Sequence, residues 1–84
     1  MRSIFSEESL KDYLYRQKTE KQILKRINAL IKEIKRSPFQ NFGKPEPLKH
    51  QLRGCWSRRI NDEHRLVCEV KNEELRIISC RFHY

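Results

Sequence analysis

The sequence predicts an α+β fold, with two helices in the first half of the chain and a sheet in the second. Residues 7–36 place apolar side chains at helical spacing, whereas residues 56–82 alternate apolar and polar side chains as strands do. Residues 37–48 hold all three prolines and are expected to form a loop between the two halves. With 84 residues the chain suffices for a single domain, residues 1–84, with one small shared core.

The first helix is predicted over residues 7–17, after a short apolar-alternating run at residues 2–5. Ser6 is a suitable N-cap, and two glutamates follow it in the first turn, where the helix dipole favours acidic side chains. We expect the apolar face of this helix to consist of Leu10, Tyr13 and Leu14.

The second helix has the stronger pattern. A capping box is predicted at its start, with Thr19 as the cap and Gln22 reaching back to it. Pro38 cannot continue a helix, so this one should end near Arg36. We expect the two tightly joined helices to pack as an antiparallel pair. The apolar stripe of the second helix consists of Ile23, Ile27, Leu30, Ile31 and Ile34.

The strands are predicted from alternation. Residues 56–60 and 65–70 flank a polar, turn-like stretch, so they should form a hairpin, and residues 75–82 give a third strand. Residues 49–52 are a candidate for a further short strand. Alternation gives the 65–70 strand an apolar face of Leu66, Cys68 and Val70 and a face carrying charge, with Arg65, Val67 and Glu69.

The charge of the chain is strongly positive. Its formal net charge is +8 and its sequence pI is about 9.8, which favours a polyanionic partner such as nucleic acid, an anionic membrane surface or an acidic protein segment. Simple solubility is the alternative explanation. The sequence has no membrane-spanning apolar stretch and no features of a signal peptide, so we expect a cytoplasmic protein with no membrane association.

The three cysteines lack the spacing of a metal site. They show no CxxC pattern, and we expect reduced thiols that act as small apolar residues of the strands. A site built from these cysteines and His64 would have no recognised ligand spacing, so no metal or other cofactor is expected. The cysteines are Cys55, Cys68 and Cys80.

Glu46 is the first candidate for chemistry. It lies between Pro45 and Pro47, which restrict the backbone on both sides, and lysines and a histidine are nearby in the sequence. A carboxylate held in a stiff, basic loop can act as a general base. The alternative is an ordinary solvated carboxylate that neutralises neighbouring lysines.

Arg59 and Arg65 are the second candidate pair. The predicted hairpin brings them close together on adjacent strands, on the face away from the core. Two guanidiniums on a rigid sheet offer planar, multi-donor recognition of phosphate. The alternative is an ordinary solvated basic strand.

The chain closes with His83 and Tyr84. An imidazole is suited to proton transfer near neutral pH, and an aromatic ring beside it can stack on a nucleobase. A frayed terminus is the alternative.

Together the candidates match metal-independent RNA cleavage: Glu46 would take the 2′-hydroxyl proton, cations including Lys49 would stabilise the phosphorus, and His83 would protonate the leaving 5′-oxygen.

Several blocks of the sequence resemble the YoeB (Txe) toxins of the RelE superfamily, which are ribosome-dependent messenger-RNA endonucleases of bacterial type II toxin–antitoxin systems. The resemblance covers essentially the whole chain. It departs at Phe5, Leu10, Cys68 and Phe82, where the family often has an aromatic residue or, at the last two, a tyrosine. It is carried by Ser6-Glu7-Glu8, Asp12-Tyr13-Leu14-Tyr15, Gly43-Lys44-Pro45-Glu46-Pro47-Leu48-Lys49-His50, Trp56-Ser57-Arg58-Arg59-Ile60, Glu63-His64-Arg65-Leu66-Val67 and His83-Tyr84.

This resemblance implies a microbial-ribonuclease-like fold with a twisted, mainly antiparallel sheet. It implies that Glu46 acts as general base, Arg65 as transition-state stabiliser and His83 as general acid. Lys49 and Arg59 match positions that bind or stabilise phosphate, and Tyr84 matches a terminal tyrosine near the scissile bond.

The implied partners are a cognate YefM-like antitoxin, the ribosomal A site with its mRNA, promoter DNA bound as a toxin–antitoxin complex, and a second copy in a homodimer. Two other functions stay open at the level of sequence. One is a basic RNA- or DNA-binding module that blocks the ribosome or co-regulates a promoter without cutting. The other is a degenerate toxin kept only to bind its antitoxin.

Overall fold

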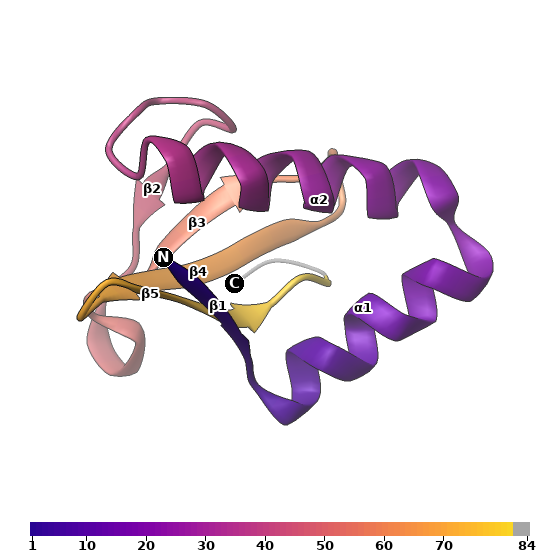
Figure 1. The fold of residues 1–84 in the computed structure, drawn as a ribbon, viewed down its shortest axis with the longest axis horizontal. Coiled ribbons are helices and arrows are strands. Elements are labelled where there is room, and N and C mark those ends of the chain that lie inside the picture. Colours follow the sequence, from indigo (N-terminus) through magenta and orange to yellow (C-terminus); the bar gives the residue numbers. More distant parts are fainter. Residues whose placement is uncertain (82–84) are drawn as a thin grey trace.

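The computed structural model describes residues 1–81, which form one mixed sheet with two α helices packed on it (Figure 1). This confirms the predicted α+β fold. The order of strands across the sheet is β1-β5-β4-β3-β2, with β1 parallel to β5 and every other neighbouring pair antiparallel. The elements in chain order are β1 (Arg2–Phe5), α1 (Glu7–Thr19), α2 (Lys21–Arg36), β2 (Glu46–Pro47), the 3-10 helix η1 (His50–Leu52), β3 (Trp56–Arg59), β4 (Arg65–Lys71) and β5 (Glu74–Ser79).

Helix α1 begins as predicted but buries a different face. The hydroxyl of Ser6 accepts a hydrogen bond from the backbone N–H of Ser9 at 3.1 Å, which confirms the N-cap. Leu10 and Leu14 are 44% and 46% exposed, so the predicted apolar face is wrong for both. The helix instead buries Ser9, whose hydroxyl donates to a backbone carbonyl of β5, and Arg16.

The predicted capping box at the start of α2 is also wrong. Thr19 remains in α1, and its hydroxyl donates to the Tyr15 carbonyl at 2.8 Å. Glu20 caps both helices through its backbone, while its side chain pairs with Arg16 and forms no cap. Helix α2 ends at Arg36 as predicted, and the two helices diverge from their connection rather than lying side by side along their length (Figure 1).

The predicted strands β3, β4 and β5 are confirmed. The predictions for the segment between α2 and β3 are wrong. The short strand expected at residues 49–52 is instead η1, and the expected loop contains β2, a two-residue edge strand. The β4–β5 hairpin closes through Asn72 and Glu73, both with positive φ, as a two-residue type I′ turn requires.

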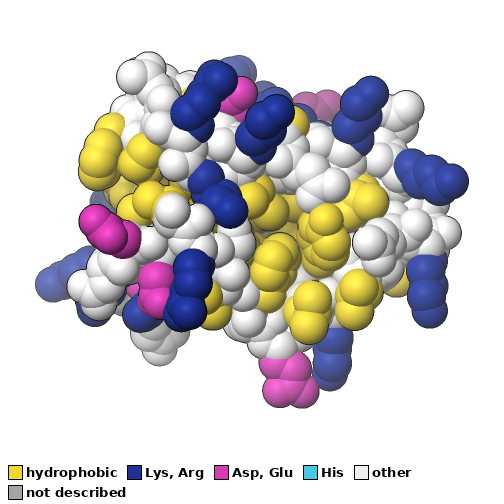
Figure 2. Space-filling view, in the orientation of Figure 1, with side chains coloured by type: hydrophobic (Ala, Val, Ile, Leu, Met, Phe, Trp, Pro, Cys, Tyr) yellow, Lys and Arg dark blue, Asp and Glu magenta, His cyan; other side chains and the backbone are white. Residues whose placement is uncertain are grey.

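The core lies between the helices and the sheet. Ile27, Leu30 and Ile34 of the predicted α2 stripe are buried there, and Leu66 and Ile77 face them from β4 and β5. On the face shown in Figure 2, hydrophobic side chains gather between the two helices and Lys and Arg side chains surround them. No helix within residues 1–81 is long and apolar enough to cross a membrane.

Candidate active site

Arg59 and Arg65 lie directly opposite each other on β3 and β4. Their Cα atoms are therefore about 5 Å apart, and both side chains project from the same face of the sheet. That face is opposite the one on which Arg58 and Leu66, their neighbours in sequence, are buried. The predicted arginine pair is thus formed by the register of the hairpin.

Backbone oxygens of the β3–β4 turn orient Arg65. Its Nη1 donates to the carbonyls of Asn61 at 2.6 Å and His64 at 3.1 Å. The Asn61 side-chain oxygen in turn accepts the backbone N–H groups of Glu63 and His64, at 2.9 and 2.7 Å, which fixes the turn. Within residues 1–81 Arg65 forms no salt bridge. Its positive charge is therefore oriented without being neutralised by a carboxylate of the described chain.

Arg59 is held from three sides. Its Nη2 pairs with the exposed carboxylate of Asp62 at 2.9 Å, and its backbone N–H donates to the Gly43 carbonyl at 2.6 Å. Its own carbonyl accepts from Arg26 on α2 at 3.3 Å. An Asp62 side chain that is wholly exposed is a weak competitor, because water and salt screen such a pair.

Glu46 joins the arginines through the sheet register. It pairs with Ser57, which lies two residues before Arg59 on β3, so its side chain projects from the same face. By strand geometry the Cα atoms of Glu46 and Arg59 are roughly 8 Å apart. An exposed carboxylate thus lies at the edge of the sheet, on the face that also carries the two arginines.

The loop before Glu46 has an unusual backbone conformation and packs against the core. Gly43 and Lys44 both have positive φ, 73° and 48°, and the Gly43 carbonyl accepts the Arg59 N–H. A Cβ on Gly43 would lie 2.9 Å from Leu30 Cδ2, so any other residue here would displace the buried Leu30 side chain of α2. This close approach sets the position from which Glu46 enters the sheet.

Of the remaining predicted site residues, the structure describes Lys49 alone. Lys49 is exposed and immediately precedes η1, three residues after Glu46. His83 and Tyr84 lie outside the described residues, as does Phe82. No group of three or more His, Cys, Asp or Glu side chains within residues 1–81 is arranged to hold a metal ion.

A buried polar cluster, which the sequence pattern did not predict, adjoins the turn that orients Arg65. Arg16 and His64 are 1% and 4% exposed, and Arg16 Nη2 lies 2.9 Å from Nε2 and 3.2 Å from Nδ1 of the imidazole. Arg16 also pairs with Glu20, and the guanidiniums of Arg16 and Arg81 lie over the ring of Tyr15. Helix α1 is thereby joined to the turn that orients Arg65 and to the end of the described chain. In the sequence, this buried polar face of α1 is indicated only by the helical spacing of Ser9, Arg16 and Glu20.

Burial lowers the pKa of His64, the nearby charge of Arg16 lowers it further, and Glu63 and Glu20 oppose this shift. The imidazole is therefore held in its neutral form near neutral pH. The thiol pKa values of Cys68 and Cys80 are raised by burial to about 11 and about 12, which leaves both thiols protonated.

Comparisons with known proteins identify the family of the chain. Residues 5–84 match the model of a family described as the YoeB-like toxin of bacterial type II toxin–antitoxin systems. The chain is 60% identical over 84 residues to Toxin YoeB of Escherichia coli K12, with both chains fully covered. It is 60% identical to Toxin YoeB of Synechocystis, covering 98% of that protein, and 45% identical over 85 residues to Toxin RelK of Mycobacterium tuberculosis, with both fully covered.

Solved structures give the same result. A YoeB/ParE toxin from Agrobacterium tumefaciens superposes with a TM-score of 0.95 at 45% identity over all of both chains. The toxin in a YoeB–YefM complex from Staphylococcus aureus gives 0.92 at 45% identity, covering all of this chain and 98% of that one. YafQ of E. coli, at 19% identity and a TM-score of 0.82, shares the fold.

The fold and the full-length similarity place the chain in the class of bacterial type II toxin–antitoxin toxins. Within that class it belongs to the YoeB family.

Proposed function

We propose that the chain, acting as one domain over residues 1–84, is a ribosome-dependent endoribonuclease that cleaves translated mRNA without a metal. The observation that supports this most strongly is the register of the sheet, in which Glu46, Arg59 and Arg65 share one face. On a shared face, a carboxylate could accept a proton while the guanidiniums stabilise a phosphorane at the same phosphodiester.

In the proposed reaction Glu46 removes the proton of a ribose 2′-hydroxyl, and the oxygen attacks the adjacent phosphorus. Arg65, already oriented by two carbonyls, donates to the non-bridging oxygens of the pentacoordinate phosphorus, supported by Arg59 and Lys49. His83 protonates the departing 5′-oxygen, and Tyr84 contacts the base beside it. The products are a 2′,3′-cyclic phosphate and a free 5′-hydroxyl.

The test is primer extension on an mRNA translated by purified ribosomes, with the Glu46→Gln and His83→Gln variants. Each should lower the cleavage rate by roughly 10²–10⁴, as loss of a general base or acid does. Glu73→Gln is the matched control, because Glu73 is an exposed carboxylate in the β4–β5 turn. A folded Glu46→Gln variant that cleaves at the full rate would remove Glu46 from the mechanism.

A binding module that blocks the ribosome without cutting is the alternative, and the +8 charge is the observation that favours it. Such a module would stall ribosomes but create no new RNA ends, and it would not depend on Glu46 or His83. The same primer-extension assay therefore separates the two functions.

We also propose that the chain is neutralised by a YefM-like antitoxin, binds promoter DNA only as part of that complex, and forms a homodimer. Relatives at 45% identity are described as a YoeB–YefM complex and as a YoeB dimer. The positive charge favours an acidic antitoxin segment as well as ribosomal RNA. Light scattering of the chain alone and with the antitoxin encoded beside it tests both assemblies.

A further inference from the structure

The guanidinium of Arg65 is held through one of its three nitrogens. Within residues 1–81 its Nη1 donates to the backbone carbonyls of Asn61 at 2.6 Å and His64 at 3.1 Å, whereas Nε and Nη2 form no hydrogen bond. Both hydrogens of Nη1 are thereby used. The planar group is fixed, and its Nε–Nη2 edge is left unused by this part of the chain. Such an edge is a fork of donors that pairs with two oxygens of a phosphate.

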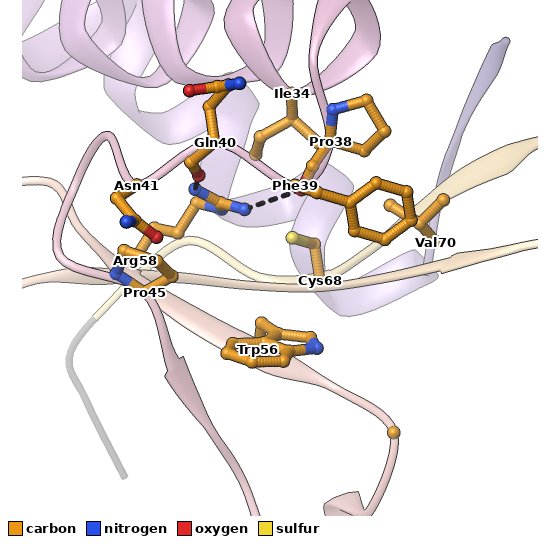
Figure 3. A pocket seen from close by; sticks show the side chains of 11 residues that line it. Ile34, Pro38, Phe39, Gln40, Asn41, Pro45, Trp56, Arg58, Cys68 and Val70 are labelled. Carbon is orange, nitrogen blue, oxygen red and sulfur yellow. Dashed lines mark hydrogen bonds between the residues drawn. The ribbon is translucent and has the colours of Figure 1, made fainter.

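Arg58, on the opposite face of the sheet, is bound by the backbone in a different way (Figure 3). It is 5% exposed, and both of its Nη atoms donate to backbone carbonyls, Nη1 to those of Gln40 and Phe42 and Nη2 to that of Pro38. Arg65 is half-buried and uses one Nη atom. The two arginines therefore differ in how much of the guanidinium remains for a ligand.

Arg65 needs an anchor because Arg59 lies directly opposite it on β3. Like charges in directly opposite positions of an antiparallel pair repel each other. An arginine side chain also has several rotatable bonds, so a guanidinium without a fixed partner would move away from its charged neighbour. The two carbonyl oxygens bound to Nη1 hold the Arg65 cation in place against this repulsion.

The two carboxylates of the same turn have other partners. Asp62 pairs with Arg59 at 2.9 Å, and Oε1 of Glu63 lies 3.3 Å from Nε2 of His64. Neither carboxylate forms a salt bridge with Arg65. The turn therefore gives Arg65 neutral oxygens, and the positive charge of Arg65 is not neutralised by the acids beside it.

The Asn61 side chain fixes the two carbonyls that bind Arg65. Its Oδ1 accepts the backbone N–H groups of Glu63 at 2.9 Å and His64 at 2.7 Å, as in an Asx turn. The His64 carbonyl also accepts the backbone N–H groups of Ile60 at 3.0 Å and Asn61 at 3.3 Å. The turn is thus closed on itself, and the two acceptors of Arg65 are held relative to each other.

Helix α1 holds the side chain of His64. The imidazole is 4% exposed and lies against the guanidinium of Arg16, which is 1% exposed, with Nη2 2.9 Å from Nε2. Arg16 in turn pairs with Glu20. Because the carbonyl of the same histidine accepts from Arg65, a displacement of the imidazole would also move an acceptor of Arg65.

We propose that Asn61 and His64 are positioning residues for Arg65, and that Arg16 anchors His64 to α1. The inference rests on the proposed function, in which Arg65 stabilises the transition state. Together the three residues present the Nε–Nη2 edge of Arg65 to the non-bridging oxygens of the scissile phosphate. None of them has to contact the reacting atoms.

Asn61→Ala tests this role because it removes the Oδ1 acceptor and keeps the backbone carbonyl. In single-turnover cleavage on ribosomes it should lower the maximal rate about tenfold, as a small misplacement of a catalytic group does. The ribosome concentration that gives half the maximal rate should stay unchanged. Asn61→Ser should restore most of the rate, since a serine oxygen can accept the same N–H groups, although more weakly.

Asn28→Ala is the matched control. The Asn28 side chain also accepts a hydrogen bond, from the Tyr13 hydroxyl at 2.7 Å, but it lies on α2. This variant should cleave at the parent rate. A rate loss in Asn28→Ala equal to that in Asn61→Ala would overturn the proposal, because any lost side-chain hydrogen bond would then have the same effect.

A double-mutant cycle separates positioning from a general structural effect. If Asn61 acts through Arg65, Asn61→Ala should slow the parent chain but should not slow the Arg65→Ala chain further. Equal factors in the two backgrounds, or no recovery of the rate in Asn61→Ser, would overturn the proposal.

NMR of the guanidinium groups tests the same role without cleavage, and Arg65→Ala identifies the Arg65 signals. In the parent chain the Nη1 protons should be resolved from those of Nη2, because two hydrogen bonds slow rotation about the Cζ–Nη1 bond. Asn61→Ala should average them. Arg58 is the internal control, since its three acceptors lie outside the turn. Averaged Arg65 signals in the parent chain, or unchanged ones in Asn61→Ala, would overturn the proposal.

Arg16→Met tests the anchoring by α1 with the same measurement. Loss of the contact with the imidazole should broaden or average the Arg65 signals, whereas Arg36→Met, which breaks a surface pair with Glu33, should leave them as in the parent chain. Unchanged signals in Arg16→Met would remove Arg16 from the positioning set.

The two kinds of measurement distinguish this proposal from the proposed function. A parent chain whose Arg65 is restrained, and is released by Asn61→Ala, supports the positioning even if the chain cuts no mRNA, and the missing cleavage would then contradict the ribonuclease assignment alone. A chain that cuts mRNA with an Arg65 that does not respond to Asn61→Ala would contradict the positioning alone.

Discussion

The guanidinium of Arg16 contacts the imidazole of His64, with Nη2 2.9 Å from Nε2, and both side chains are almost fully buried. The contact joins residues 48 positions apart in the chain. The backbone carbonyl of His64 accepts from Arg65, so α1 is coupled through this pair to the arginine of the candidate site. A buried cation and a buried imidazole coexist here because the imidazole is neutral and Glu20 balances the arginine.

Replacing Arg16 with methionine should lower the free energy of unfolding by about 2 kcal/mol. Breaking a fully buried ion pair costs about 3–5 kcal/mol, and the 43% exposure of the Glu20 side chain reduces that cost here. Arg36→Met is the control, because Arg36 forms the same kind of pair with Glu33 on a helix surface and should cost about 0–0.5 kcal/mol. Urea unfolding measures both. Equal losses in the two variants would show that the Arg16 cluster is not a stabilising unit.

The stability of the protein should fall as the pH drops below about 6.5, in part because of His64. Burial and Arg16 lower its pKa in the folded chain below the ordinary value of 6.5, with Arg81 adding to the effect and Glu63 and Glu20 opposing it. Between the lowered pKa and 6.5 the unfolded chain binds more protons, so acid favours unfolding, and above about pH 7.5 the contribution is constant.

Protonation of a single group can change the free energy of unfolding by at most about 1.4 kcal/mol per pH unit. Urea unfolding at about pH 7.5 and about pH 5.5 should therefore show a larger loss of the free energy of unfolding for the parent chain than for His64→Gln. Protonation of carboxylates also contributes to the loss of stability in this pH range. Because both proteins carry the same carboxylates, that contribution cancels when the two losses are compared. The same loss in both would refute the role of His64.

Arg65→Lys should lower the cleavage rate by roughly tenfold to a hundredfold, and Arg65→Ala by more. Lysine keeps the charge but lacks the planar set of donors and cannot make the carbonyl contacts of Arg65 and bind phosphate at the same time. Single-turnover cleavage on ribosomes measures the rate. Arg53→Lys is a control at an exposed arginine outside strands β3 and β4. Full activity of Arg65→Ala would assign transition-state stabilisation to another residue.

The elements that the sequence predicted are those fixed by local signals. Ser6 as a cap, the α2 stripe and the Arg59–Arg65 pairing each depend on spacing within a few residues or across one tight hairpin. Strand β2 was not predictable in this way, because it is two residues long, lies at an edge and includes a proline. The burial of Arg16 was missed for a different reason. Charged residues are normally exposed, and the contact that holds this one in the interior comes partly from His64, which is distant in the sequence.

Gly43→Ala should destabilise the protein by about 2–4 kcal/mol and also slow cleavage. Alanine at φ +73° is strained, and its Cβ would lie 2.9 Å from Leu30 Cδ2 and 3.2 Å from Arg58 Cβ, both within packed structure. Relief of these contacts moves the loop whose Gly43 carbonyl accepts from Arg59, and Glu46 moves with it.

Gly54→Ala is the matched comparison for this effect. Gly54 also has a positive φ, +94°, but its added Cβ would meet only the end of the Glu69 side chain, at 3.1 Å, which can rotate away. That variant should lose about 1 kcal/mol, the cost of the backbone angle alone, and should cleave at the parent rate. Urea unfolding and ribosomal cleavage of both variants separate packing at Gly43 from backbone strain. Equal destabilisation would show that contact with Leu30 does not fix the loop that carries Glu46.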